Sequence, residues 1–567
     1  MLRNFFRAIA NIIRVLLIPL RWPIHRLSRP KGEWLRLKLM PRVVDIEAPL
    51  VFWKKRLGIA KTSVLHRIRK LMAQVGSDPR LKGVFIELPP LQCGWVECCA
   101  LRDVIRGLRD LGKQVIVYLP EGGGNQEYYV ASSADQIWTS PQASLGVLGI
   151  GAEFHYPKRL LDRLGVELQV FACGEFKTAA ESLVRTTMSV AQREQMDALL
   201  QTRHEALTTA ISARFSGDTA RAERIYASSP LTGANAQADG IVDAVCYPDE
   251  TYRLLTGSDK SQWVTPSRYL RWSTWKPVKP WRRASYIAVI EVHGPIVLHS
   301  AFHTRRASER SQLVAQLKKV RKDPHAIGLL LHIDSPGGSA LASDFIHREV
   351  CKTREDKPVV AYFANVAASG GYYIAQGAHA IVAEPLSITG SIGVISAKPV
   401  LQRLFSHAGI DVHTLRKAPH PDMFSATREL DDEEQAIMKR ETKQFYESFV
   451  KVVAEGRRWD FARVESVARG RVWSGKDAHH HGLVDHLGGV ETAVTEILKR
   501  AYTEAPSRTD AVELKVFSTK AGKLSQWAPF NSALDGQRGM GQALDLLNLC
   551  LGSEKVFYYG AGLPIVG

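Results

Sequence analysis

The segment VIVYLPEGGGNQEYYVASSADQIWTSPQASLGVLG at residues 115–149 occurs a second time, as VVAYFANVAASGGYYIAQGAHAIVAEPLSITGSIG at residues 359–393. The two copies are 244 positions apart, and shorter matches continue on both sides of them. Each copy begins with an apolar run of the buried-strand type, followed by a turn and a helical pattern. A duplication this long predicts two units of the same fold, which we place at residues 46–255 and 284–500 and call the first and the second repeat.

Both repeats alternate short apolar strands with longer amphipathic helices. This order is typical of right-handed βαβ crossovers, so we predict an α/β fold in which each repeat has a mainly parallel sheet flanked by helices. In the second repeat the predicted strands are 287–292, 329–333, 359–362 and 380–382, and the predicted helices are 340–353, 369–376 and 431–455.

Positive charge is concentrated at the N-terminus. Residues 1–58 hold 13 Lys or Arg and three acidic residues, which gives more than half of the net charge of +18. The apolar stretch 8–24 contains two arginines and two prolines, and one central arginine costs about 2.5 kcal/mol in a membrane span. We therefore predict that residues 1–45 are a basic amphipathic anchor in the plane of a membrane, with a spanning helix and a buried helix as alternatives.

The other segments indicate no metal or cofactor. Residues 256–283 contain four tryptophans and several basic residues, which favours a linker on the protein or membrane surface, and residues 501–567 are an extension without a clear pattern. The seven cysteines form neither a disulfide framework nor a zinc-ligand pattern. The histidines at 479–481 lie in a polar connection, where we expect a solvated loop.

Two glycine-rich turns in the second repeat each follow a predicted strand and precede a helix. The first is Asp-Ser-Pro-Gly-Gly at 334–338, and the second is Ala-Ala-Ser-Gly-Gly-Tyr-Tyr at 367–373. Backbone N–H groups exposed at such turns, together with the helix N-terminus, can stabilise a developing oxyanion. Ser369 is a candidate nucleophile in the second turn, although a serine there is often only a helix N-cap. Both turns fall at the carboxyl ends of adjacent parallel strands, where active sites of open α/β sheets lie.

These motifs, in this order, resemble the signal peptide peptidase A (protease IV) family. The resemblance also includes Leu-Ser-Ile-Thr-Gly-Ser-Ile-Gly at 386–393, Gly-Arg-Val-Trp-Ser-Gly at 470–475 and Gly-Leu-Val-Asp at 482–485. The chain is similar to the long, duplicated bacterial form, whose units resemble the crotonase and Clp-peptidase fold. The resemblance implies a serine endopeptidase with a Ser-Lys dyad that degrades cleaved signal peptides and other short or unfolded chains through an acyl-enzyme.

The resemblance also implies the roles of individual residues. Ser369 would be the nucleophile, and Lys177, in the Gly-x-x-Lys pattern that begins at Gly174, would be the general base. The backbone N–H groups of Gly338 and Gly370 would form the oxyanion hole. Ser391 would hydrogen-bond the lysine amine, with a plain turn serine as the alternative.

The residues themselves support a lysine base. No histidine lies between residues 379 and 407, where Clp-type peptidases place theirs. Within the duplication Ser369 corresponds to Asn125, and Lys177 corresponds to Ser425. Each copy therefore keeps one member of the pair, which suggests that both copies contribute to one site.

Lys177 must be neutral to accept a proton, and only burial lowers a lysine pKa enough. Glu181 lies four residues further along, so a charged surface pair of Lys177 with Glu181 is the alternative. Two other functions stay open from the residues alone: a crotonase-like acyl-CoA enzyme, and a non-catalytic membrane scaffold with a degenerate peptidase fold.

The expected partners are peptide substrates and a membrane surface, without nucleic acid. The resemblance further implies a homo-oligomer, a tetramer in that family, at the bacterial inner membrane with the catalytic part on the periplasmic side.

Overall fold

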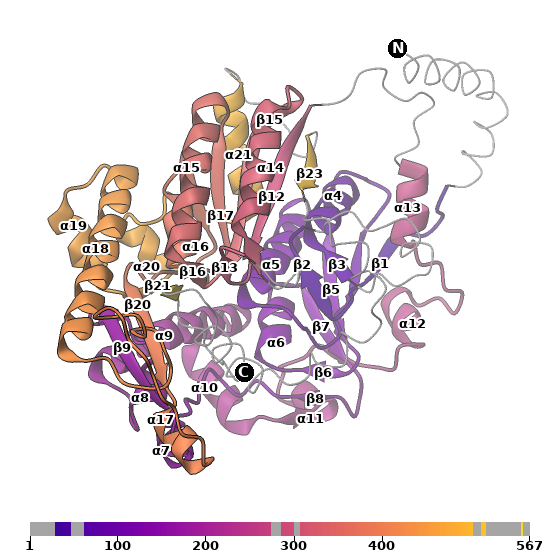
Figure 1. Cartoon of the computed structure of the whole chain (residues 1–567). Coiled ribbons are helices and arrows are strands. Elements are labelled where there is room, and N and C mark those ends of the chain that lie inside the picture. The colour runs from indigo at the N-terminus through magenta and orange to yellow at the C-terminus, as the bar shows by residue number, and fades with distance from the viewer. Residues whose placement is uncertain are drawn as a thin grey trace. The chain divides into compact units, whose positions relative to one another are not determined.

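The computed structural model describes residues 29–46, 62–273, 285–299, 307–502, 512–517 and 557–559. These residues fold into two compact units (Figure 1). Unit 1 takes its residues from 1–150 and 203–285, and unit 2 takes its residues from 151–202 and 286–566. Residues 151–202 belong to the first repeat in sequence but pack in unit 2, so the division into compact units does not follow the repeat boundary.

Unit 1 is built on a five-stranded parallel sheet with the strand order β1-β4-β5-β7-β11. Its strands are β1 (Trp34–Lys38), β2 (Arg42–Val44), β3 (Thr62–Val64), β4 (Gly83–Glu87), β5 (Gln114–Leu119), β6 (Gly122–Gly123), β7 (Gln136–Thr139), β8 (Ser144–Leu145), β10 (Leu231–Thr232) and β11 (Ala244–Val245). Its helices are α4 (Leu65–Gly76), α5 (Trp95–Asp110), α6 (Asn125–Ala131), α10 (Thr219–Ser228), α11 (Gly233–Ala238), α12 (Thr251–Thr256) and α13 (Pro266–Ser273). Helix α9 (Val190–Ser212) starts in unit 2 and ends in unit 1.

Unit 2 contains an eight-stranded, mainly parallel sheet and a six-stranded sheet. Its strands are β9 (Glu167–Cys173), β12 (Tyr286–His293), β13 (Ile296–Val297), β14 (Ser308–Glu309), β15 (Ala326–Ser335), β16 (Gly337–Ser339), β17 (Val359–Ala368), β18 (Ala380–Ala383), β19 (Ile388–Gly390), β20 (Val394–Val400), β21 (Val472–Ser474), β22 (His486–Leu487), β23 (Glu513–Phe517) and β24 (Phe557–Tyr559). Its helices are α7 (Lys158–Leu164), α8 (Glu181–Val184), α14 (Arg310–Lys322), α15 (Ala340–Asp356), α16 (Gly370–Ala375), α17 (Gln402–His407), α18 (Asp432–Arg457), α19 (Phe461–Val467), α20 (Gly475–His480) and α21 (Val490–Ala501). The predicted α/β fold is therefore confirmed.

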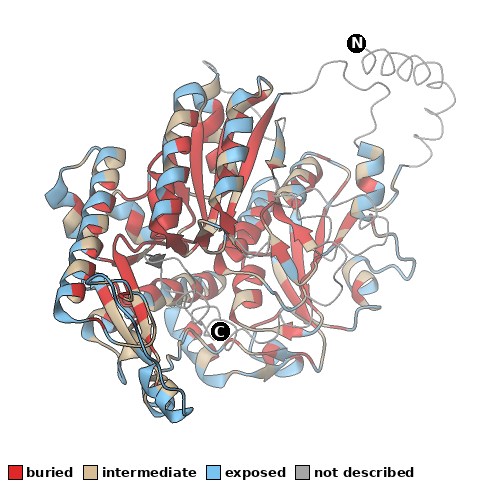
Figure 2. Ribbon diagram, viewed as in Figure 1, coloured by how far each residue is buried: buried red, intermediate tan, exposed pale blue. Residues whose placement is uncertain are grey.

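The large sheet of unit 2 is the core that positions the second repeat's motifs. Its path runs β21-β19-β17-β15-β12-β23, and only the β19–β21 pair on this path is antiparallel. Residues 329–331 and 359–363 of the two central strands are fully buried (Figure 2), as expected for strands covered on both faces. Helices α14 and α15 pack against each other, and α21 packs on β15 and β17.

The same tertiary contacts occur in both units, which supports the duplication. The buried hydroxyl of Tyr128 donates to the Ile241 carbonyl at 2.9 Å, and that of Tyr372 donates to the Leu483 carbonyl at the same distance. The two tyrosines occupy corresponding positions in the two repeats, and so do the two residues whose carbonyls accept the hydrogen bonds. Tyr128 stands in the short helix α6 and Tyr372 in the short helix α16. Each hydroxyl connects its helix to a segment near the C-terminal end of the same repeat.

Several segments outside the repeats have a definite place. Residues 34–38 and 42–44, which fall within the predicted anchor, form β1 and β2 of unit 1, and the predicted amphipathic stretch at 1–28 lies outside the described residues. In the predicted linker, the Trp263 ring packs on Phe85 with ring centroids 5.0 Å apart. Among the helices that the structure describes, none has the length and apolar character needed to cross a membrane.

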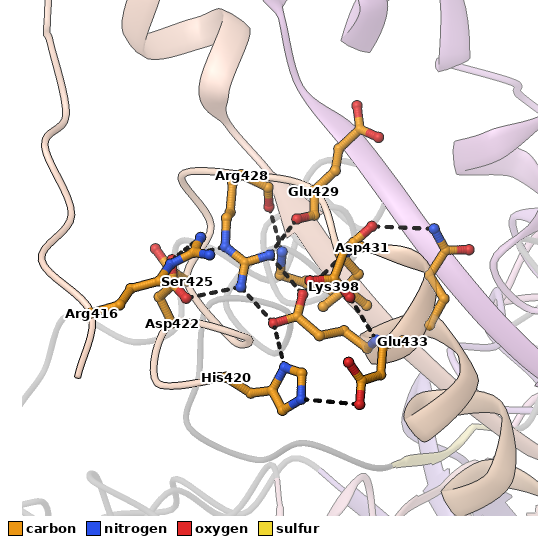
Figure 3. A network of polar contacts seen from close by, with 12 residues as sticks. Lys398, Arg416, His420, Asp422, Ser425, Arg428, Glu429, Asp431 and Glu433 are labelled. Atoms are coloured by element: carbon orange, nitrogen blue, oxygen red, sulfur yellow. Dashed lines mark hydrogen bonds and ion pairs between the residues drawn. The ribbon is translucent and has the colours of Figure 1, made fainter. Parts of the chain in front are cut away.

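A polar network anchors the long connection between α17 and α18. The guanidinium of Arg428 lies in the middle of it and donates to both carboxylates of Asp422 and Glu434 (Figure 3). The Glu434 side chain is fully buried, and hydrogen bonds from Arg428 lower its pKa to about 2. The same arginine holds the pKa of Asp422 well below its ordinary range.

Replacing Arg428 by Met should destabilise unit 2 by about 3 kcal/mol at neutral pH, because a buried carboxylate loses its partner. Arg416, which pairs with Asp422 from a side chain that is 42% exposed, is the matched control, and Arg416→Met should cost much less because solvent screens an exposed pair. Urea unfolding measures both. A depressed carboxylate pKa stabilises the fold above the unfolded pKa and loses this effect as the pH falls, so the Arg428 difference should shrink below about pH 4. Equal losses in the two variants would contradict this account.

Candidate active site

Ser369 stands at the sharp turn between β17 and α16. Its φ angle is 54°, in the left-handed region that a non-glycine residue rarely occupies. The backbone N–H donates to the Gly390 carbonyl at 2.9 Å, and the backbone carbonyl accepts from the Tyr373 N–H at 2.8 Å. Ser369 occupies the N-cap position of α16, but its side chain makes no capping hydrogen bond, so the hydroxyl does not have the capping role considered as the alternative. Backbone conformations of this kind are strained and occur most often at active sites and ligand-binding turns.

The Lys177 amine lies beside that hydroxyl. Nζ is 3.0 Å from Ser369 Oγ, 2.8 Å from Ser391 Oγ and 2.9 Å from the Ser391 carbonyl oxygen. The lysine is only 5% exposed, and burial holds its pKa well below that of an exposed lysine. Lys177 precedes helix α8, which begins at Glu181, and so the exposed helical pair of Lys177 with Glu181 does not form.

Glycines allow the lysine segment to approach the turn before β21. A β-carbon placed on Gly470 would lie 2.6 Å from the Lys177 backbone nitrogen, and one on Gly174 would lie 2.5 Å from the Arg469 carbonyl oxygen. Both glycines also have positive φ angles, 80° and 106°. The Phe176 N–H donates to the Arg469 carbonyl at 2.9 Å. The Gly-x-x-Lys pattern therefore needs its glycine for backbone contact as well as for the turn.

Ser391 is held by the same turn. Its φ angle is 52°, and its N–H donates to the Arg471 carbonyl at 2.7 Å. Strand β21, which follows Arg471, pairs with β19, which precedes Ser391. One edge of the sheet thus sets the place of both the lysine segment and its serine partner.

Gly338 and Gly370 approach each other next to Ser369. A β-carbon on Gly370 would lie 3.4 Å from the Gly338 nitrogen and 2.5 Å from Ser343 Oγ, and Gly338 has a φ angle of 150°. Strand β16, which contains Gly338, also pairs with β24 in the antiparallel sense, with Gly338 opposite Tyr558. A polypeptide backbone therefore lies along the glycine turn.

Asn125 corresponds to Ser369, and Ser425 corresponds to Lys177. Both make structural contacts instead. The Asn125 side-chain amide donates to the Gly149 carbonyl at 2.7 Å and accepts from the Gly149 N–H at 3.2 Å. Ser425 Oγ lies 2.7 Å from Thr427 Oγ1. Asp334, the first residue of the Asp-Ser-Pro-Gly-Gly turn, accepts the Val366 N–H at 3.2 Å.

The sequence missed the groups that hold the lysine segment in place. They are the backbone carbonyl of Arg469 and the side chain of Gln195 on α9, while the Arg471 carbonyl holds Ser391. The Gly-Arg-Val-Trp-Ser-Gly motif indicated the turn. A contact made by a backbone carbonyl, however, cannot be recognised from the type of residue that carries it. A single glutamine in an amphipathic helix provided no signal.

Comparison with known proteins identifies the family. Residues 108–261 and 352–503 match the model of peptidase family S49. The chain is 30% identical over 466 residues to the chloroplastic serine protease SPPA of Arabidopsis thaliana, across 80% of this chain and 68% of that protein. It is 30% identical over 429 residues to Protease 4 of Salmonella typhi, across 72% and 68%. A solved structure of a lysine-to-alanine mutant of the 1510-N membrane-bound stomatin-specific protease, in complex with a substrate peptide, covers 42% of this chain and 93% of its own, with 18% identity and a TM-score of 0.26.

These matches define the protein as a serine protease with two copies of one peptidase domain. The chain belongs to peptidase family S49.

Replacing Lys177 by Met should stabilise the protein, because the variant no longer buries an amine. Between the folded and the unfolded pKa of Lys177, only the unfolded chain holds the proton, so the wild type loses about 1.4 kcal/mol for each unit by which the pH falls. The stability difference should therefore grow as the pH falls from the unfolded pKa of a lysine, about 10.4, toward the lowered folded pKa. Urea unfolding at several pH values measures it.

Lys443, whose side chain is 72% exposed, provides the control, and Lys443→Met should show no such pH dependence. If Lys177→Met kept the pH slope of the wild type, the lysine would be charged in the folded protein.

Proposed function

We propose that the protein cleaves peptide bonds with a dyad of Ser369 as nucleophile and Lys177 as general base. The observation that carries this proposal is the 3.0 Å distance between Lys177 Nζ and Ser369 Oγ, with the lysine buried and its pKa lowered. A neutral amine at hydrogen-bond distance from a hydroxyl is the arrangement that a serine–lysine mechanism requires.

In the first step the Lys177 amine takes the Ser369 proton while Oγ attacks the carbonyl carbon of the substrate. The negative charge moves to the carbonyl oxygen, where the N–H groups of Gly338 and Gly370 would stabilise it. Collapse of the tetrahedral intermediate breaks the C–N bond and leaves the acyl group on Ser369. The ammonium of Lys177 gives its proton to the leaving amine, and a water, deprotonated by the same lysine, then hydrolyses the ester.

Ser391 orients the base in this mechanism. Its hydroxyl and its carbonyl both lie within 2.9 Å of Nζ. A neutral amine has two N–H donors and one lone pair, so two donors directed at Ser391 leave the lone pair for the Ser369 proton. This geometry supports the role that the family resemblance gives to Ser391.

We propose extended polypeptides as substrates, namely cleaved signal peptides and other short or unfolded chains. Strand β24 supports an extended mode of binding, because its backbone pairs with β16 at residues 337–339 and with β20 at Ile395. A substrate strand that takes the place of β24 in this pairing would bring its backbone past Gly338. The name of a relative, "Putative signal peptide peptidase SppA" of Enterococcus faecium, supports the signal-peptide class.

Ser369→Ala and Lys177→Ala should each lower the turnover of a fluorogenic peptide by about a thousandfold or more, and the double variant should be no slower than either, because the two residues act as one unit. A fluorophosphonate should label the wild type at Ser369, as read by mass spectrometry. Ser425→Ala, at the position in the second repeat that corresponds to Lys177, is the control and should keep wild-type turnover. Turnover above about a tenth of wild type in Lys177→Ala would show that another group is the base.

We further propose that the N-terminal basic segment binds an anionic membrane surface and that the protein assembles as a homo-oligomer at the bacterial inner membrane with its catalytic part on the periplasmic side. The support for membrane binding is the excess of Lys and Arg in residues 1–58, because each basic residue near an anionic surface contributes about 1 kcal/mol. The support for assembly and for location is the family resemblance.

Deleting residues 1–28 should abolish sedimentation with vesicles that contain anionic phospholipid while peptide turnover stays unchanged, because the deleted residues lie outside both repeats. Vesicles of neutral phospholipid are the control for the full chain. Undiminished sedimentation of the shortened chain would place the membrane-binding surface elsewhere.

A further inference from the structure

Gln195 of helix α9 is a buried amide that joins three parts of unit 2. Its side chain is 1% exposed. Nε2 donates to the Phe176 carbonyl at 3.1 Å and to Thr178 Oγ1 at 2.7 Å, and Oε1 accepts from the Val472 N–H at 3.2 Å. The residues that Nε2 contacts stand immediately before and after Lys177.

The partners of Gln195 fix the orientation of its amide. A backbone carbonyl can only accept and a backbone N–H can only donate, so Nε2 must face Phe176 and Oε1 must face Val472. Both N–H groups of the Gln195 amide donate a hydrogen bond, its oxygen accepts one, and all three bonds lie in a buried site. Loss of the amide would therefore leave the Phe176 carbonyl and the Val472 N–H without this partner.

Strand β21 connects this amide to the second partner of the lysine. Val472 is bound to Gln195, and the preceding Arg471 carbonyl accepts the N–H of Ser391. Ser391 in turn contacts the lysine amine through its hydroxyl and its carbonyl. Gln195 thus aligns the segment that carries Lys177 with the strand that holds Ser391.

We propose that Gln195 is a positioning residue of the peptidase: it holds the Lys177 segment against β21, so that the amine stays buried within hydrogen-bond distance of Ser369. The inference rests on the proposed Ser-Lys dyad. Nζ stands at the end of a long flexible side chain, so a small rotation of the segment moves it out of reach of Oγ. A displacement of about 1 Å can lower a rate a hundredfold. A looser segment would also admit water to the amine and let it keep its proton at higher pH.

The test is the pH profile of kcat/KM for Gln195→Met, which keeps the length of the side chain and removes its hydrogen bonds. Activity should rise with pH as the lysine loses its proton, and the midpoint of this rise should move up by about one unit, with about a tenfold or greater loss of kcat/KM near neutral pH. The concentration of folded enzyme is set by titration with a fluorophosphonate.

The matched control is Gln192→Met, one turn earlier on the same helix. Gln192 is also buried, but its Oε1 accepts from the Tyr156 hydroxyl at 2.8 Å. This variant should keep the wild-type midpoint. Gln195→Glu keeps an acceptor for the Val472 N–H and loses both donors, so its midpoint should move up as well.

A wild-type midpoint in Gln195→Met, with any loss confined to thermal stability or to the amount of folded enzyme, would overturn the proposal. If Gln195→Met does not fold, Gln195→Glu decides in the same way. If neither variant is folded, as read by circular dichroism, Gln195 serves the fold and the proposal fails. Activity in Lys177→Ala would instead refute the dyad itself, whatever the Gln195 variants do.

Discussion

The structure of the site depends on one unfavourable condition, the burial of a lysine amine. Lys177 is 5% exposed, and burial alone is enough to lower its pKa. Its described polar partners are two serines, Ser369 and Ser391, which can satisfy a neutral amine and cannot neutralise an ammonium ion. Most of the surrounding architecture keeps that amine away from water. The glycine contact at Gly470 brings two backbones together where side chains would hold them apart.

The two repeats differ at the position of Ser369, the serine that contacts the buried lysine. In unit 1, Asn125 stands at the position that corresponds to Ser369, and its amide satisfies both polar groups of the Gly149 backbone. An amide with two fixed partners stabilises a turn and has no nucleophile to offer. The second repeat keeps Ser369 in the strained conformation, and Lys177 beside it comes from the first repeat. The turn at Asn125 is therefore structural, whereas the turn at Ser369 is strained.

Side-chain patterns were sufficient to predict much of this protein. The apolar runs at 287–292 and 359–362 predicted central strands, and the small residues around Ser369 predicted a turn with an accessible backbone. The sequence also grouped Lys177 with the first repeat, which is correct for its ancestry, but the segment packs in unit 2. Tertiary contacts made by backbone carbonyls, such as that of Arg469 to Phe176, have no residue signature. For the same reason Gln195 could not be told from any other helical glutamine.

Unit 2 is discontinuous in sequence, so the parts of the site are synthesised at different times. Lys177 is made first, its partner Ser369 follows 192 residues later, and Val472 lies 277 residues after Gln195. At roughly 5–20 residues per second, the last of these intervals takes tens of seconds. During that time the lysine segment has neither its serine nor the strand that holds it, so its amine remains in water and charged. A nascent chain therefore lacks the buried pair of Lys177 and Ser369 until almost all of unit 2 has been synthesised.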